Sequence, residues 1–168
     1  MFGATAGSGN PVTIVLDGDG IDPTRMQQIA AWLNVAETTF VLPATHPEAD
    51  YRVRIFSVTA ELRFAGHPML GICHAWLAAG NASRNQDNVV QECAAGLNAG
   101  LAHWLPTVAV QQPPYVARQG AALARERRLS ISREGGEIWV AGATRTLIDG
   151  TLHAFAAAEG ELLPSRKA

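Results

Sequence analysis

An apolar stretch at residues 69–79 constrains the possible folds more than any other part of this sequence. It reads M-L-G-I-C-H-A-W-L-A-A, with G-H-P directly before it and Gly80 directly after it. Proline is favoured in the first turn of a helix and glycine just past its end, so these residues are predicted to form one helix. Its apolar residues occupy most sides, and we therefore expect the helix to be buried inside a sheet.

The residues around this helix supply the strands of such a sheet. Four segments are rich in β-branched or aromatic residues and are predicted as strands: 11–16, 38–42, 51–58 and 88–92. Between the first two, a helix is expected up to Asn34, with Asp22 as its cap and Pro23 in its first turn. One face of that helix carries apolar residues at helical spacing: Met26, Ile29, Ala30 and Leu33.

The second half of the chain is also predicted to be rich in strands. Residues 129–133 and 137–140 flank E-G-G, which is typical of a β-hairpin, and residues 144–148 add a further strand. A short helix is expected at 97–105, ended by Pro106. The sequence therefore predicts an α+β fold with a mostly antiparallel sheet wrapped around a central helix.

Charge and composition exclude several classes of function. The 168 residues include 13 Lys and Arg against 15 Asp and Glu, a net charge of −2 with no long run of one sign. This charge favours neither nucleic acid nor an anionic membrane as a partner. The single lysine, Lys167, argues against Schiff-base chemistry and against a P-loop, because both need a lysine held rigidly in a site.

The pattern of cysteines and apolar runs indicates a cytoplasmic protein. Two cysteines, Cys73 and Cys93, are too few for a disulfide scaffold or a four-thiolate zinc site. No apolar run reaches the roughly 18 residues of a membrane span, and no secretory signal is recognisable. We therefore expect no contact with a membrane.

Two residues stand out as candidates for chemistry. His67, beside Gly66, lies where a strand is expected to become a helix, and the N–H groups of a helix start favour an anion such as a substrate carboxylate. The alternative is a histidine that only caps the helix. Glu37 precedes an apolar strand, where a carboxylate can serve as general acid or base; the alternative is an ordinary loop glutamate.

The remaining histidine and the cysteines support weaker hypotheses. His74 lies seven residues after His67, whereas helical metal pairs prefer a spacing of four, so we expect no metal and interpret His74 as a core residue. Cys73 and Cys93 could act as a thiol acid/base pair in a racemase, but buried structural thiols are the favoured alternative.

Several motifs in order resemble the PhzF-like phenazine-biosynthesis isomerases, within the diaminopimelate-epimerase-like superfamily. They are S-G-N-P at 8–11, E-T-T-F at 37–40, F-A-G-H-P at 64–68 with Gly71, and V-V-Q-E-C at 89–93. After a jump, the resemblance continues from residue 97 to G-T-L at 150–152. The family's D-P-x-T-G-S motif has no counterpart, so the chain resembles an internally shortened member.

The resemblance implies a function and a site. The family performs a cofactor-independent proton shift on a small cyclic carboxylic acid, of the trans-2,3-dihydro-3-hydroxyanthranilate type. It implies Glu37 and His67 as catalytic residues and no cofactor. The implied substrate-binding residues are Ser8, Gly9, Asn10 and Gly66. Because a whole motif is missing, an alternative is an inactive remnant that serves as a binding or oligomerisation module.

The resemblance also implies a division of the chain. Residues 1–96 correspond to the first family domain without its last part, 97–152 to a remnant of the second domain with the C-terminal strands, and 153–168 to a tail. The family site lies between two domains, so a homodimer is a possible way to replace the missing wall. A shortened edge strand would also favour pairing between chains.

Overall fold

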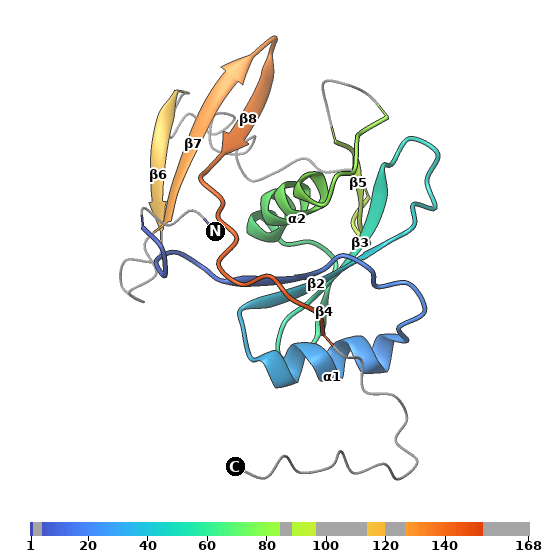
Figure 1. Cartoon of the computed structure of the whole chain (residues 1–168). Helices are drawn as coiled ribbons and strands as arrows, with labels where there is room; N and C mark the ends of the chain where they lie inside the picture. The colour runs from blue at the N-terminus through green and yellow to red at the C-terminus, as the bar shows by residue number, and fades with distance from the viewer. Residues whose placement is uncertain (2–4, 85–88, 97–113, 120–126, 153–168) are drawn as a thin grey trace, which may run out of the picture.

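The computed structural model describes residues 1, 5–84, 89–96, 114–119 and 127–152, which form two sheets and two helices (Figure 1). The larger sheet consists of β1 (Val12–Val15), β2 (Glu37–Leu42), β3 (Tyr51–Phe56), β4 (Glu61–Leu62) and β5 (Gln91–Glu92). The helices are α1 (Pro23–Leu33) and α2 (Gly66–Ala78). The smaller sheet consists of β6 (Tyr115–Gln119), β7 (Arg127–Glu134) and β8 (Glu137–Ala141).

The larger sheet is mixed: two of its strand pairs are antiparallel and two are parallel. β1 runs parallel to β2, with α1 as the connection between them, and β2 runs antiparallel to β3. On the other edge of β3, β4 pairs antiparallel at one end and β5 pairs parallel at the other. β1 is the outer strand of this sheet and pairs only with β2 in the described part of the chain.

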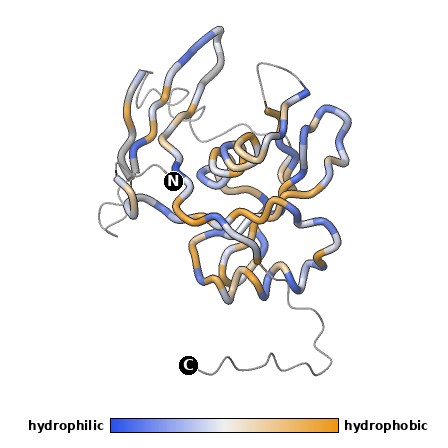
Figure 2. Tube along the Cα trace, viewed as in Figure 1, coloured by the Kyte–Doolittle hydropathy of each residue, from blue (hydrophilic) through white to orange (hydrophobic). Residues whose placement is uncertain are grey.

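The core lies on both faces of the larger sheet. Seven buried residues fill the face toward α2: Val41, Tyr51, Val53, Ile55, Met69, Ile72 and Cys93. Six fill the face toward α1: Met26, Ile29, Ala30, Phe40, Leu42 and Phe56. Alternate residues of β2 and β3 therefore serve opposite faces, as the period of a strand requires. Figure 2 shows apolar residues concentrated where the sheet lies between the two helices.

α1 confirms the expectation drawn from its sequence pattern. The Asp22 side chain accepts a hydrogen bond from the Arg25 N–H, and Pro23 is the first helical residue. Met26, Ile29 and Ala30 are buried and Leu33 is partly buried against the same cluster. The helix ends at Asn34, whose φ of 52° is left-handed, a conformation that asparagine tolerates better than most residues.

α2 begins three residues earlier than predicted and is covered on one side. Its buried residues are Pro68, Met69, Gly71 and Ile72, all in the first two turns. The expectation of burial on most sides is wrong for the second half, because Leu77 is 45% exposed. The interpretation of His74 as a core residue is also wrong, since its side chain is exposed beside the Thr146 hydroxyl. The sheet that packs on α2 covers one face of it.

The C-terminal hairpin is confirmed, and the strand expected after it is not. β7 and β8 are joined by Gly135 and Gly136, whose φ values of 57° and 89° fit the mirror-image turn that suits a two-residue hairpin loop. Residues 144–148 form no strand, because no neighbouring strand is paired with them in the described chain. The helix expected at 97–105 lies outside the described residues.

A close backbone contact ties the end of β1 to β2. The Gly18 N–H donates to the Val41 carbonyl at 2.9 Å. A Cβ on Gly18 would lie 2.9 Å from Phe40 Cβ and 3.0 Å from the Val41 oxygen, both parts of a buried strand that cannot move aside cheaply.

We therefore expect Gly18→Ala to lower the free energy of unfolding by about 1–3 kcal/mol, measured by urea denaturation. Gly150→Ala is the matched control, because no atom lies within 4 Å of the position its Cβ would take. Equal stability of the two variants would contradict the tight contact.

Candidate active site

Three side chains from separate segments meet where β1 and β2 begin. Asn10 Nδ2 lies 3.0 Å from His67 Nε2, and Glu37 Oε2 lies 3.0 Å from the same nitrogen. Asn10 is buried, and the side chains of His67 and Glu37 are only 10% and 18% exposed. The structure thus brings together three of the residues singled out in the sequence.

Each of these residues is placed by its own element. Glu37 is the first residue of β2 and pairs in register with Val12 of β1. It shares a strand face with Val41, which packs in the core against α2, so the alternation of β2 turns Glu37 toward that helix. His67 is the second residue of α2. Asn10 directly precedes the segment that becomes β1.

His67 Nε2 carries either a proton or a lone pair, but it lies beside two polar partners, Asn10 and Glu37. If Nε2 accepts a hydrogen bond from the Asn10 amide, it cannot donate to Glu37; if it carries the proton, the carboxylate is its natural acceptor. Glu37 Oε2 is buried and has no aligned hydrogen bond. A buried carboxylate oxygen that close to an imidazole can take up or release a proton with little movement of heavy atoms.

The start of α2 adds a site for negative charge. Ala65 precedes the helix and offers no side-chain cap to the N–H groups of the first turn. These N–H groups and the helix dipole favour an anion at this end. Gly66 is exposed, and among the described residues a Cβ there would approach only the Phe64 ring, at 4.0 Å. A ligand can therefore come close to the backbone beside His67.

Two other predicted binding residues lie in the preceding loop. Gly9 is buried with a left-handed φ of 83°, which lets the chain turn directly into Asn10. The Ser8 hydroxyl donates to the Thr5 carbonyl at 2.7 Å and accepts from the Thr5 N–H at 3.0 Å. Ser8 thus serves the loop in this structure, and its role toward a substrate stays a prediction.

The two thiols do not form a convincing acid/base pair. Burial, assisted by the nearby Asp50 charge, raises the pKa of the Cys73 thiol, so less of it is present as the thiolate that would have to act as the base. Cys93 is buried and donates from Sγ to the Gly96 carbonyl at 3.2 Å. The described residues include no group of three or more His, Cys, Asp or Glu side chains placed to hold a metal ion.

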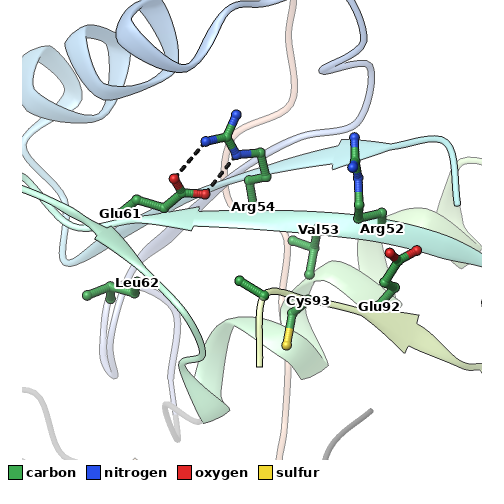
Figure 3. A pocket seen from close by; sticks show the side chains of 8 residues that line it. Arg52, Val53, Arg54, Glu61, Leu62, Glu92 and Cys93 are labelled. Atoms are coloured by element: carbon green, nitrogen blue, oxygen red, sulfur yellow. Dashed lines mark hydrogen bonds and ion pairs between the residues drawn. The ribbon is translucent and has the colours of Figure 1, made fainter. Parts of the chain in front are cut away.

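A separate cavity of about 240 Å³ lies on the other edge of β3 (Figure 3). It is lined by Arg52, Val53, Arg54, Glu61, Leu62, Glu92, Cys93 and Ala94. Arg54 and Glu61 form a two-pronged ion pair at 2.7 and 2.6 Å. Glu92 accepts from the Thr45 hydroxyl and from the N–H groups of Thr45 and His46, which fastens the loop after β2 to β5. No sequence pattern predicted these hydrogen bonds between Glu92 and the Thr45–His46 loop, which we call the Glu92 lock.

The Glu92 lock predicts a dependence of stability on pH. Its hydrogen bond with the Thr45 hydroxyl, then the backbone N–H groups of His46 and Thr45, lower the pKa of Glu92 to about 2 from 4.5. A carboxyl group with a lowered pKa stabilises the fold above its unfolded pKa, and this stabilisation is lost as pH falls from about 4.5 toward 2.

We expect Glu92→Gln to lower the melting temperature at pH 7 and to flatten its decline between pH 4.5 and 2. The exposed Glu48→Gln is the control. If both variants melted as the parent does at every pH, Glu92 would not hold the loop.

Comparison with known proteins identifies the family. Residues 1–103 match the sequence pattern of the PhzC-PhzF family of phenazine biosynthesis-like proteins. The chain belongs to this family. This match covers the three residues that meet at the site, and it confirms the resemblance drawn from the motifs.

Individual relatives agree with the assignment. The chain is 48% identical over 89 residues to antisense-enhancing sequence 1 of Schizosaccharomyces pombe, which is 53% of this chain and 30% of that protein. It is 47% identical over 70 residues to trans-2,3-dihydro-3-hydroxyanthranilate isomerase of Pseudomonas chlororaphis, which is 42% of this chain and 25% of the isomerase. The chain therefore spans less than a third of the length of these relatives.

A solved structure supports the fold class. The crystal structure of a Bacillus anthracis phenazine biosynthesis protein of the PhzF family matches with a TM-score of 0.52 and 26% identity. The match covers 83% of this chain and 36% of that protein. The α+β class predicted from the sequence is confirmed. No helix in the described residues has both the length and the apolar character needed to cross a membrane.

Proposed function

We propose that this chain is a cofactor-independent isomerase that shifts a proton on a small cyclic carboxylic acid. The observation that carries the proposal is the contact of the buried Glu37 oxygen with His67 Nε2 at 3.0 Å, at the start of α2. The proposed substrate is of the trans-2,3-dihydro-3-hydroxyanthranilate type, as in the name of the Pseudomonas relative.

In the proposed mechanism Glu37 is the general acid and base. Its carboxylate removes a proton from an activated carbon of the substrate, the double bond moves along the ring, and the same group returns the proton to a different carbon. The reaction is balanced, since no atom or electron is gained or lost. His67 faces the same carboxylate oxygen and helps to hold it; the N–H groups beside Gly66 receive the substrate carboxylate.

A second candidate function is binding without turnover. The chain covers 36% or less of the relatives named above, so a remnant that binds carboxylates at the start of α2, or that assembles with other chains, is also supported.

We propose the domain division stated above, with residues 1–96, 97–152 and 153–168 as its parts. Cys73 and Cys93 are not joined in a disulfide, which fits the reducing cytoplasm that we propose as the location.

Deuterium uptake tests the isomerase proposal. The purified chain is incubated with trans-2,3-dihydro-3-hydroxyanthranilate in heavy water, and product deuterium is followed by mass spectrometry. We expect Glu37→Gln to slow incorporation by roughly a hundredfold or more, because general acid–base groups commonly contribute that much. Glu48→Gln, an exposed glutamate outside the site, should keep the parental rate.

The same samples separate the two functions. Incorporation by the parent chain no faster than by Glu37→Gln would exclude the isomerase. Titration with the substrate, followed by isothermal calorimetry, would then show whether binding survives and whether His67→Gln weakens it. Binding that is absent or unaffected by this substitution would also exclude a binding module at the start of α2.

A further inference from the structure

The imidazole ring of His67 is aimed at Asn10 rather than at Glu37. Asn10 Nδ2 and Glu37 Oε2 both lie 3.0 Å from His67 Nε2. The contact with Asn10 is aligned as a hydrogen bond, whereas Glu37 Oε2, at the same distance, accepts none. A ring nitrogen has one direction, in the plane of the ring, for its proton or its lone pair. The amide of Asn10 therefore occupies that direction.

The hydrogen bond between these two nitrogens sets the protonation state of the ring. The Asn10 atom that faces the ring is the amide nitrogen, which can only donate. Its partner is then an unprotonated Nε2, which accepts through its lone pair, and in a neutral ring the proton lies on Nδ1. The reversed amide would present Oδ1 and would require a proton on Nε2. The orientation of one amide thus selects the tautomer of His67.

The selected tautomer has a consequence for Glu37. An unprotonated Nε2 offers the carboxylate no proton, and among the described residues Glu37 Oε2 accepts no hydrogen bond from any other group. Without the amide of Asn10, a protonated Nε2 would turn to this oxygen, which lies within reach at 3.0 Å. A hydrogen bond to a carboxylate stabilises its charged form and makes it a weaker base. Asn10 therefore keeps the oxygen of Glu37 available for a substrate proton.

The surroundings of Asn10 suit such a role. Its residue is only 5% exposed, so water has little access to compete for the amide. Gly9, with its left-handed φ of 83°, turns the chain directly into Asn10, and β1 begins two residues later. A buried side chain between a turn and a strand is held in a defined position, as a positioning group requires.

We propose that Asn10 is a positioning residue that holds His67 in the tautomer with the proton on Nδ1 and thereby keeps Glu37 available as the base. This role differs from the substrate contact that the sequence predicted for Asn10, because it acts through His67. The tautomer follows from the geometry of the site, whereas its effect on turnover rests on the function proposed above.

The first experiment determines the tautomer of His67 in the full chain without any substrate. The protein is prepared with isotopically labelled histidine, and nitrogen NMR at about pH 8.5, where a histidine ring is ordinarily neutral, shows which ring nitrogen carries the proton. His67→Gln identifies the signals of His67 among the five histidines. We expect an unprotonated Nε2. A protonated Nε2 in the parent chain would overturn the proposal, because Asn10 would then face the ring with its oxygen.

The second experiment tests whether Asn10 selects this tautomer. Asn10→Leu keeps a similar size without a donor, so we expect the proton to move to Nε2, from which it is donated to Glu37. Deuterium incorporation should then slow by roughly tenfold or more, because hydrogen bonds to charged groups commonly contribute that much. Gln28→Glu removes an amide on the exposed face of α1, where Arg25 remains its partner, and should change neither measurement.

Asn10→Asp gives a second variant in case the leucine does not fold. Its carboxylate can only accept, so a hydrogen bond with the ring again requires a proton on Nε2. An Nε2 that stays unprotonated in the folded variants would overturn the role of Asn10, and so would a parental rate in Asn10→Leu despite a changed tautomer. The expected tautomer without deuterium incorporation by the parent chain would exclude the isomerase alone, so the two proposals fail separately.

Discussion

The close approach of α2 to β1 positions the candidate site. A Cβ on Gly71 would lie 2.8 Å from Met1 Sδ, 3.2 Å from Val12 Cγ1 and 3.4 Å from Ile14 Cδ1, so glycine lets the helix lie this near the strand without displacing these side chains. The helix then starts at the edge where β1 and β2 start. His67, in its first turn, reaches Glu37 because of this packing. The core, rather than a flexible loop, therefore holds two of the three site residues.

Strand register contributes the other half of the geometry. Glu37 lies on the α2 face only because it is in phase with Thr39 and Val41; a shift of one residue would turn its carboxylate toward α1. The register is fixed by the apolar residues of β2, which are buried on both faces. The buried Oε2 of Glu37 has no aligned hydrogen bond, although His67 Nε2 lies 3.0 Å from it.

Local patterns predicted the parts of the fold that depend on local interactions. The helical spacing of Met26, Ile29 and Ala30 predicted α1, and the β-branched and aromatic residues of 51–58 predicted the strand that is observed as β3. Glu37 and His67 were singled out, but their contact joins residues that only the tertiary fold brings together. The two-residue strand β4 carries too short a pattern to be predicted. The strand predicted at 88–92 is present at Gln91–Glu92 as β5. The Glu92 lock joins residues 47 apart in the chain, and no local signal reports it.

The failure to predict the state of residues 144–148 has a physical cause that also concerns the site. A strand needs a partner, and propensity alone cannot supply one, so T-R-T-L-I pairs with no strand in the described part of the chain. In the described residues β1 pairs with β2, and at the start of its outer edge Met1 pairs with Asn10 through two backbone hydrogen bonds, at 2.9 and 3.1 Å. That edge continues from Asn10, whose amide contacts His67. Proton transfer from carbon requires a site that excludes water. In the described residues, the larger sheet and α2 cover the candidate site on some of its sides only. Any segment that pairs with the outer edge of β1 would narrow the opening beside Asn10, so the cover of this edge and the proposed chemistry are linked.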